Sequence, residues 1–311
     1  MSSKADMTTQ RLAAASCALG LLAYAGLTTL FSGSEAAAFQ AGGPPAQIEL
    51  TGIVRDFRER TVPMGHPDFE VTPDHGFKLY CGNVSPYLGA DGKPVYTGAG
   101  HKVLENWTDD HDRPICYHVA QAHPAPGDSD GTWGAADTGG IDGPDGFSQW
   151  FRDIPGINMS KLLTLTLVRQ VDGTYVFDNE VDPLYSSLGG FFPIEDQLFG
   201  NPGGFPDRNF HFTFELSSEF VYDPAGEQLF KFMGDDDMWV FIDGEIVIDL
   251  GGVHSAREQY IDLNRLNLVP GETYRLDFFF AERHRTQSNF RIVTNLQLQN
   301  VDPPTVSNIF D

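Results

Sequence analysis

Residues 230–254 read FKFMGDDDMWVFIDGEIVIDLGGVH, and this stretch decides the fold. Near its centre the dipeptide Asp243-Gly244 separates two apolar runs. Asp-Gly between such runs is a strong signal of a two-residue β-hairpin, because a type I′ turn needs positive φ at both central positions. We therefore predict an antiparallel hairpin with strands at residues 239–242 and 245–249.

Three consecutive aspartates, residues 235–237, lie at the end of this hairpin opposite its turn. Adjacent carboxylates repel one another, so such a run is either fully solvated or neutralised by a bound cation. A hard cation such as Ca²⁺ prefers oxygen ligands of this kind. The returning strand brings Asp249, Gly251, Gly252 and His254 to the same end. On these residues alone, a solvated acidic turn and a metal site are equally good interpretations.

Further strands are predicted wherever apolar and polar residues alternate. The alternating runs are residues 48–57, 162–168, 209–216, 273–280 and 289–298. Turn-forming residues separate these runs, and helical periodicity longer than a turn or two is confined to the start of the chain. The pattern predicts an all-β fold, an antiparallel β-sandwich of jelly-roll-like type.

The sandwich domain is predicted to span residues 48–300. A Gly/Pro linker, residues 39–47, precedes it, and a tail with two prolines, residues 301–311, follows it. Residues 58–146 are rich in His, Pro, Gly and Asp, which favours long irregular loops in the N-terminal half.

The first 38 residues have the features of a targeting segment. Lys4 and Arg11 provide positive charge, residues 12–31 are almost wholly apolar or small, and residues 36–38 are all alanine. This pattern predicts a signal peptide and export of the mature chain. An uncleaved N-terminal anchor is the alternative, because the apolar run is just long enough to span a bilayer.

The charge of the chain limits its partners. Its 43 acidic residues outnumber 20 basic residues, which gives a formal net charge of −23. Such a chain lacks the basic face from which nucleic-acid binding draws most of its affinity. Cations and neutral ligands such as sugars fit better. After cleavage of the leader we expect no membrane contact.

Two cysteines, Cys81 and Cys116, remain after the leader is removed. In an exported protein this even number predicts a disulfide between them. Two buried free thiols are the alternative. A metal site on the cysteines is disfavoured because no CxxC spacing or matching histidine cluster accompanies them.

The loop that precedes the last predicted strand supplies further candidates. Asn289 or Glu282 would add oxygen ligands to a calcium ion held by the aspartates. Arg283 and His284 are candidate contacts for an anionic or sugar ligand, with charge balance of the acids as the alternative. His254 is a candidate ligand contact, and a hydrogen-bonded structural histidine is an equally common alternative.

Catalytic motifs are missing from the sequence. Neither GxSxG nor HExxH occurs, and an acid-rich chain offers too many carboxylate pairs to select those of a glycosidase. We therefore expect a binding protein and not an enzyme. Trp239 is assigned to the core, whereas Trp107, Trp133 and Trp150 lie in or beside loops and are candidates for stacking on a sugar.

Several motifs, in the same order, resemble the fibro-slime family of exported proteins. They are YVFDNEVDPLYSSLGGFFPIEDQLFGN, HFTFEL, the 230–254 stretch and FFFAERHRTQSNFRI, with LTGIVRDF and DGKPVY in the N-terminal half. The resemblance covers roughly residues 49–298. That family is related to the β-sandwich domain named after the anthrax protective antigen, which also occurs in flocculins and cell-surface adhesins and attached to glycosidases.

The resemblance implies a sandwich that binds Ca²⁺ and, through the ion, sugar hydroxyls. In the adhesins, neighbouring aspartates joined by a cis peptide hold the ion. Asp235 and Asp236 occupy those positions here, Asp237 follows them, and Asn289 is implied as a loop ligand.

We therefore expect a secreted or cell-surface protein that binds polysaccharide or a cell-surface glycan in a calcium-dependent way and acts in adhesion. An extracellular matrix protein with a purely structural calcium ion is the alternative. A carbohydrate-active enzyme is the third possibility.

Overall fold

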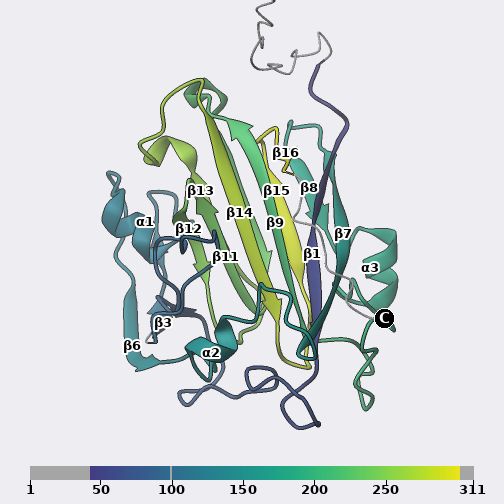
Figure 1. The fold of residues 1–311 in the computed structure, drawn as a ribbon. Helices are drawn as coiled ribbons and strands as arrows, with labels where there is room; N and C mark the ends of the chain where they lie inside the picture. The colour runs from purple at the N-terminus through teal and green to yellow at the C-terminus, as the bar shows by residue number, and fades with distance from the viewer. Residues whose placement is uncertain (1–42, 99, 302–311) are drawn as a thin grey trace, which may run out of the picture. The chain divides into compact units, whose positions relative to one another are not determined.

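The described part of the chain comprises residues 43–98 and 100–301 of a computed structural model (Figure 1). The predicted leader, residues 1–38, lies outside the described residues, as do residues 39–42 of the linker and 302–311 of the tail. Within the described ranges, no helix is both long enough and apolar enough to cross a membrane.

The predicted hairpin is confirmed. It consists of β11 (Asp237–Ile242) and β12 (Glu245–Leu250), which pair antiparallel. Asp243 and Gly244 have φ values of 52° and 78°, as both central residues of a type I′ turn require.

β11 and β12 lie at one end of an eleven-stranded antiparallel sheet, whose order is β12-β11-β14-β9-β1-β7-β8-β15-β10-β13. The further strands are β1 (Gln47–Phe57), β7 (Asn158–Arg169), β8 (Tyr175–Asp178), β9 (Phe212–Val221), β10 (Leu229–Gly234), β13 (Arg257–Asp262), β14 (Thr273–Glu282) and β15 (Phe290–Thr294). The short β16 (Gln299–Asn300) pairs with β9.

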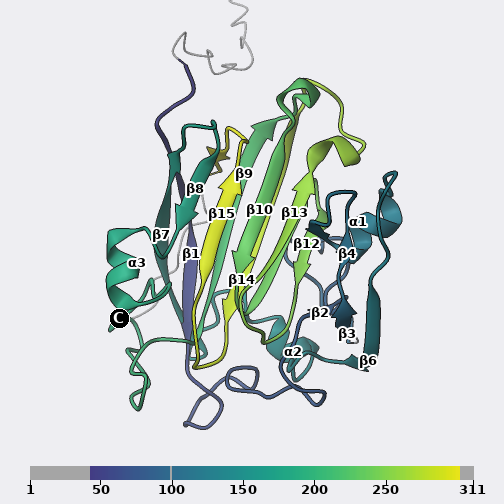
Figure 2. The ribbon, with the colours of Figure 1, turned by 180° about the vertical axis from the view of Figure 1, so that it is seen from behind.

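The sheet folds back on itself into two layers (Figures 1 and 2). β14, β9 and β1 lie in one layer, and β15, β10 and β13 lie in the other. β7 pairs with β8 only through its last two residues, and the sheet turns there from one layer to the other.

Phenylalanine rings fill the space between the layers. The ring centroids of Phe232 in β10 and Phe278 in β14 are 5.7 Å apart, and those of Phe290 in β15 and Phe280 in β14 are 5.1 Å apart. These residues are buried, as the alternation of apolar and polar residues predicts. The predicted all-β antiparallel sandwich is therefore confirmed.

The five alternating runs form β1, β7, β9, β14 and β15, with some differences at the ends. β9 begins at Phe212 and not at residue 209, and Asn209 instead donates a hydrogen bond to Asp56 at 2.9 Å. β15 ends at Thr294 and not at residue 298.

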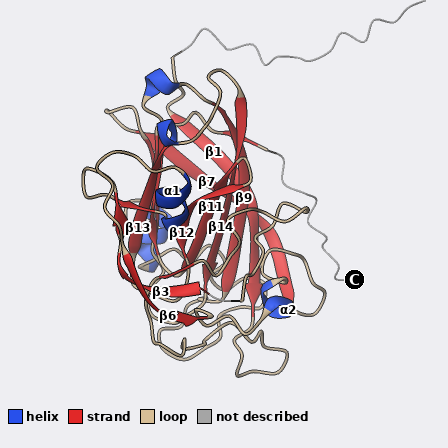
Figure 3. Cartoon of the chain, turned by 90° about the vertical axis from the view of Figure 1, so that its left-hand side faces the viewer, coloured by secondary structure: helices blue, strands red, loops and turns tan. Residues whose placement is uncertain are grey.

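The N-terminal half carries short elements between its predicted loops. These are β2 (Tyr80–Cys81), β3 (Gly100–Glu105), β4 (Trp107–Thr108), β5 (Pro114–Ile115), β6 (Thr132–Asp137), α1 (Tyr117–Ala122) and α2 (Pro144–Phe147). β2, β3 and β6 form a separate three-stranded sheet. The remaining short elements are α3 (Pro183–Leu188) and the 3₁₀ turns η1 (Pro224–Gly226) and η2 (Leu263–Arg265). Helix is a minor component and strands dominate (Figure 3).

This N-terminal segment covers the outer face of the sheet at β11, β12 and β14. Trp150 lies 6.1 Å from Trp239 of β11, and Phe151 lies 4.9 Å from Phe279 of β14, measured between ring centroids. All six residues of β11 are consequently buried. The expectation that residues 273–280 form a half-buried strand is wrong for its second half, because β14 is covered there on both faces.

The predicted disulfide is not formed. Cys81 and Cys116 are both free thiols, and both lie in the apolar core. Burial raises the pKa of each thiol, so both stay protonated and unreactive in the folded protein. Of the alternatives that the sequence left open, the structure favours two buried thiols.

Candidate functional site

The aspartate run lies where the chain crosses between the two layers. Asp235 and Asp236 connect β10 in one layer to β11 in the other, and the peptide bond between them is cis. The loop of residues 283–289 makes a second crossing, from β14 to β15. Because β10 pairs with β15 and β11 pairs with β14, both crossings occur at the same end of the sandwich.

Asp235 is held by Asn289, which was predicted as a ligand of the same calcium ion. The backbone N–H of Asn289 donates to Asp235 Oδ1 at 2.6 Å, and its side-chain Nδ2 donates to Oδ2 at 2.7 Å. The structure therefore brings together two residues that lie 54 positions apart in the sequence.

Asp236 receives backbone hydrogen bonds from two loops. The N–H of His254 donates to Oδ1 and the N–H of Arg283 donates to Oδ2, each at 3.2 Å. Its side chain therefore joins the segment after β12 to the segment after β14.

Asp237 has a different role from its two neighbours. Its carboxylate accepts from the Nε of Arg283 and from the N–H of Gly252, each at 2.6 Å. Arg283 is fully buried, and its terminal nitrogens donate to the carbonyl oxygens of Gly139 and Gly140 and of Asp68. Asp237 and Arg283 thus form a buried ion pair, which favours charge balance over ligand contact for Arg283.

Glu282 is the residue of the cluster that has a buried carboxylate oxygen without a hydrogen-bond partner among the described residues. It is fully buried, and its Oε1 lies 3.4 Å from the backbone N–H of His284. Its Oε2 is also buried and has no hydrogen-bond partner among the described residues. A buried carboxylate oxygen without a donor is costly unless a bound ion or water satisfies it.

The electrostatics of the cluster favour a cation. Burial raises the pKa of Asp235 to about 6. Burial and then the charge of Asp235 raise the pKa of Asp236 well above its usual range, and burial together with both aspartates does the same for Glu282. Arg283, the cation beside these three acids, is already paired with Asp237.

The chemistry of this donor set fits Ca²⁺, which takes carboxylate, amide and carbonyl oxygens. Asp235, Asp236, Glu282 and Asn289 are the side chains that would hold the ion. Within the described residues, two groups of three His or acidic side chains have ligand atoms within 4.8 Å of one another, and neither includes these acids. The ligand atoms of Asp235, Asp236 and Glu282 therefore do not all lie within 4.8 Å of one another, and these side chains would have to move closer together to hold one ion.

The two histidines that were predicted to contact a ligand, His254 and His284, differ in exposure. His254 is buried, and its ring nitrogens lie 2.9 Å and 3.3 Å from the carbonyl oxygens of Ser255 and Leu250. This arrangement favours a structural histidine. His284 is half-buried, and its ring packs edge-on against the exposed Phe77 with centroids 4.8 Å apart.

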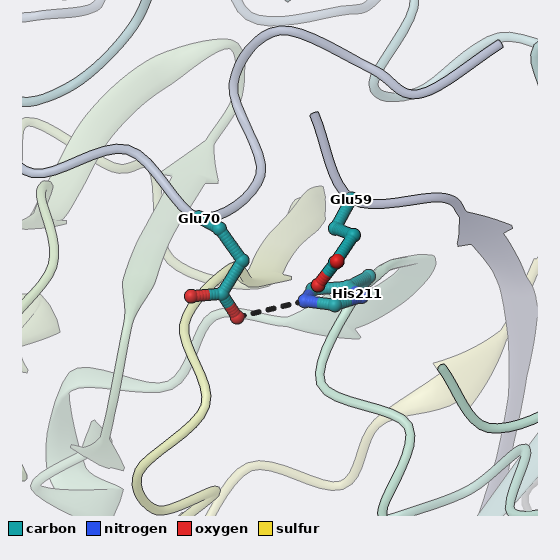
Figure 4. A group of neighbouring side chains, drawn as sticks. All are labelled: Glu59, Glu70 and His211. Atoms are coloured by element: carbon teal, nitrogen blue, oxygen red, sulfur yellow. Dashed lines mark hydrogen bonds and ion pairs between the residues drawn. The ribbon is translucent and has the colours of Figure 1, made fainter. Parts of the chain in front are cut away.

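A second cluster, Glu59, Glu70 and His211, lies beside this site and was missed by the sequence analysis (Figure 4). The Nε2 of His211 is 2.9 Å from Oε1 of Glu70. Arg285 pairs with Glu59 through its guanidinium and donates its N–H to Glu70 at 3.0 Å. The cluster is thus an ion-pair network that anchors the start of the 283–289 loop. No spacing in the sequence indicates it, because His211 lies 141 positions after Glu70.

Residues 200–309 match the PA14 domain, a β-rich domain known from adhesins and glycosidases. These residues include the aspartate run, Glu282 and Asn289. They therefore carry the whole candidate calcium site.

The chain is similar over most of its length to proteins of Dictyostelium discoideum. It is 34% identical to protein psiD over 260 residues and 31% identical to protein psiC over 261 residues, which is 82% and 81% of this chain. It is also 37% identical to protein psiJ over 169 residues, 49% of this chain and 22% of that protein. The chain spans 42% of the length of psiD and of psiC.

A solved structure, the GH31 α-xylosidase of Xanthomonas citri, aligns with 81% of this chain and 22% of its own length. The identity is 10% and the TM-score is 0.24, so this likeness carries no argument.

Proposed function

We propose that this protein is an exported, calcium-dependent carbohydrate-binding protein that acts in adhesion at a cell surface or in the extracellular space. The PA14 match supports this class, since PA14 domains occur in carbohydrate-binding and adhesion proteins. The observation that carries the calcium proposal is the group of three buried carboxylates with the unpartnered Oε2 of Glu282.

The calcium ion would act first on the loops. Asp235 and Glu282 lie at the two crossings between the layers, so an ion that neutralises both would fix the crossings relative to each other. Asn289 is half-buried and belongs to the same loop as the exposed residues Thr286 and Gln287, so we place the solvent-facing side of the ion at this loop. A sugar hydroxyl reaching the ion from that side would complete its coordination.

A structural calcium ion in an extracellular matrix protein is the second candidate, and one observation favours it. The side chains of Asp235 and Asp236 belong to residues only 2% and 4% exposed, and Glu282 is fully buried. An ion so enclosed would hold the loops and leave recognition to other surfaces.

We further propose that the protein has no enzymatic activity. We also propose that the fibro-slime resemblance reflects common ancestry.

Calorimetric titration of the mature chain with Ca²⁺ tests the site. We expect wild type to bind one ion and Asp236→Asn to bind it at least about tenfold more weakly, equivalent to about 1.4 kcal/mol. Asp243→Asn is the matched control, because Asp243 is exposed at the turn of the same hairpin and asparagine suits a type I′ turn. Equal calcium binding by Asp236→Asn and wild type would remove the site assignment.

A glycan array with and without chelator separates the two candidates. Retention that requires calcium is expected of the adhesin, whereas the matrix protein would bind calcium and retain no glycan. Release of reducing sugar from a polysaccharide panel would contradict the proposal that the chain is not an enzyme.

A further inference from the structure

The structure separates the three tryptophans that the sequence offered as sugar-stacking candidates. Trp107 is 6% exposed and Trp150 is fully buried, so both belong to the core. Trp133 is 39% exposed. The fourth tryptophan of the chain, Trp239, is also fully buried, so Trp133 is the one tryptophan on which an external ligand can stack.

Trp133 lies in β6, the edge strand of the small sheet β2-β3-β6. This sheet is at the periphery of the fold, beside the large sandwich (Figures 1 and 3). The next residues of β6, Gly134 and Ala135, are small. No bulky side chain of β6 therefore adjoins the indole ring on its C-terminal side.

The indole ring of Trp133 is held in place by other aromatic rings. The imidazole of His101 stacks on it at 4.6 Å with an interplanar angle of 24°, and the rings of Tyr117 and Trp107 lie 4.5 Å and 5.6 Å away. An exposed aromatic ring that is already fixed loses little side-chain freedom when a ligand binds. His101 covers one face of the indole, so a ligand would stack on the opposite face.

The surroundings of Trp133 are polar and accessible. Glu105 and Asn106 are exposed at the end of the neighbouring strand β3, and Thr132 precedes the indole in β6. The hydroxyl of Thr132 donates to Oε2 of Glu105 at 3.2 Å, and the remaining donors and acceptors of these exposed side chains are open to a ligand. A pyranose has the matching chemistry, with an apolar C–H face and hydroxyls at its edge, and a neutral sugar is not repelled by a net charge of −23.

We propose that Trp133 is the stacking platform of a second carbohydrate subsite, which binds a neutral pyranose without calcium. This proposal takes its ligand class from the proposed function but does not depend on the calcium ion. The two subsites lie on connected elements, because Gly139 and Gly140, just after β6, accept hydrogen bonds from Arg283 of the candidate calcium site. Asp137 at the end of β6 is four positions after Trp133, which corresponds to roughly 13 Å of strand.

Binding to polysaccharide in the presence of chelator tests the platform. The mature chain is incubated in EGTA with cellulose, chitin, mannan and galactan, and the bound fraction is measured for wild type, Trp133→Ala and Phe205→Ala. Phe205 is 97% exposed and serves as the control for a surface aromatic elsewhere on the chain. We expect Trp133→Ala to bind at least one of these polysaccharides about tenfold more weakly than wild type.

A second readout does not depend on Trp133→Ala folding normally. Soluble oligosaccharide should change the tryptophan fluorescence of wild type, and Trp133→Phe, which keeps an aromatic ring at this position, should lose that change.

Each outcome bears on the two proposals differently. Equal retention by Trp133→Ala and wild type, or a fluorescence change that persists in Trp133→Phe, would overturn the platform. Glycan retention that is abolished by EGTA would also overturn it while leaving the calcium-dependent function intact. Chelator-insensitive retention that requires Trp133 would support the platform even if calcium titration fails.

Discussion

The substitution Asp235→Asn should have opposite effects on the stability of the calcium-free protein and on its response to calcium. Burial raises the pKa of Asp235 from 3.8 to about 6, so the folded state binds the proton more tightly than the unfolded state. In the calcium-free protein the folded state therefore loses stability relative to the unfolded state as pH rises from about 4 to 6. The loss is complete above the folded pKa.

The size of this effect follows from the shift. About two pKa units at 1.36 kcal/mol each correspond to roughly 3 kcal/mol of destabilisation at pH 8. Asparagine carries no charge and keeps an oxygen that can accept from the N–H of Asn289, and the amide of Asn289 can rotate to accept from the new Nδ2. We therefore expect Asp235→Asn to stabilise the calcium-free protein at pH 8 by up to about 3 kcal/mol. At pH 4 the two proteins should differ little.

Calcium should reverse the order of stability of wild type and Asp235→Asn at pH 8. A bound ion would neutralise the carboxylate in wild type but would find a weaker ligand in Asp235→Asn, so calcium should raise the melting temperature of wild type more. For a chain of this size each kcal/mol corresponds to roughly 2–4 °C. Scanning calorimetry at pH 4 and pH 8, in EGTA and in calcium, measures the melting temperature of each protein under all four conditions. Asp243→Asn serves as the control. A variant less stable than wild type in EGTA at pH 8, or equally stabilised by calcium, would refute the reasoning.

Two further predictions concern the buried groups near the site. Arg283→Leu leaves Asp237 buried without its partner and should lower the free energy of unfolding by about 3–5 kcal/mol, measurable by denaturant titration. The paired variant Arg283→Leu/Asp237→Leu should recover part of that loss, and no recovery would mean that the ion pair is not the cause. Cys81 and Cys116 should resist a thiol reagent in the native state and react fully in denaturant without reductant. Two unreactive sulfurs in denaturant would show a disulfide and contradict the structure.

The sequence by itself determined the class of fold and the location of the acidic run. Alternation with a period of two requires that one side of each strand be buried, and Asp243-Gly244 specifies the turn because positive φ is a local property of those residues. The sequence also predicted that Asp235 and Asn289 belong to one site, through the family resemblance.

The sequence named Glu282 as a candidate ligand beside the aspartates but did not predict that Asp237 has a different role. It grouped three aspartates, whereas the structure pairs Asp237 with Arg283 and leaves Asp235 and Asp236 beside Glu282. That division depends on the pairing of β10 with β15 and of β11 with β14, which no local pattern records. An aspartate or glutamate is the same letter in the sequence whatever its role. The residues that surround it in the folded chain decide whether its carboxylate forms an ion pair or remains without a partner.

The same reason explains the remaining differences. The segment before β7 contains few regular elements, so the sequence did not indicate that it would bury the outer face of β11 and β14. That burial places Trp150 in the core and leaves Trp133 exposed, although both tryptophans lie in similar sequence surroundings. Exposure is a property of the packed chain, because it depends on which distant segment covers a residue, and only the tertiary structure decides it.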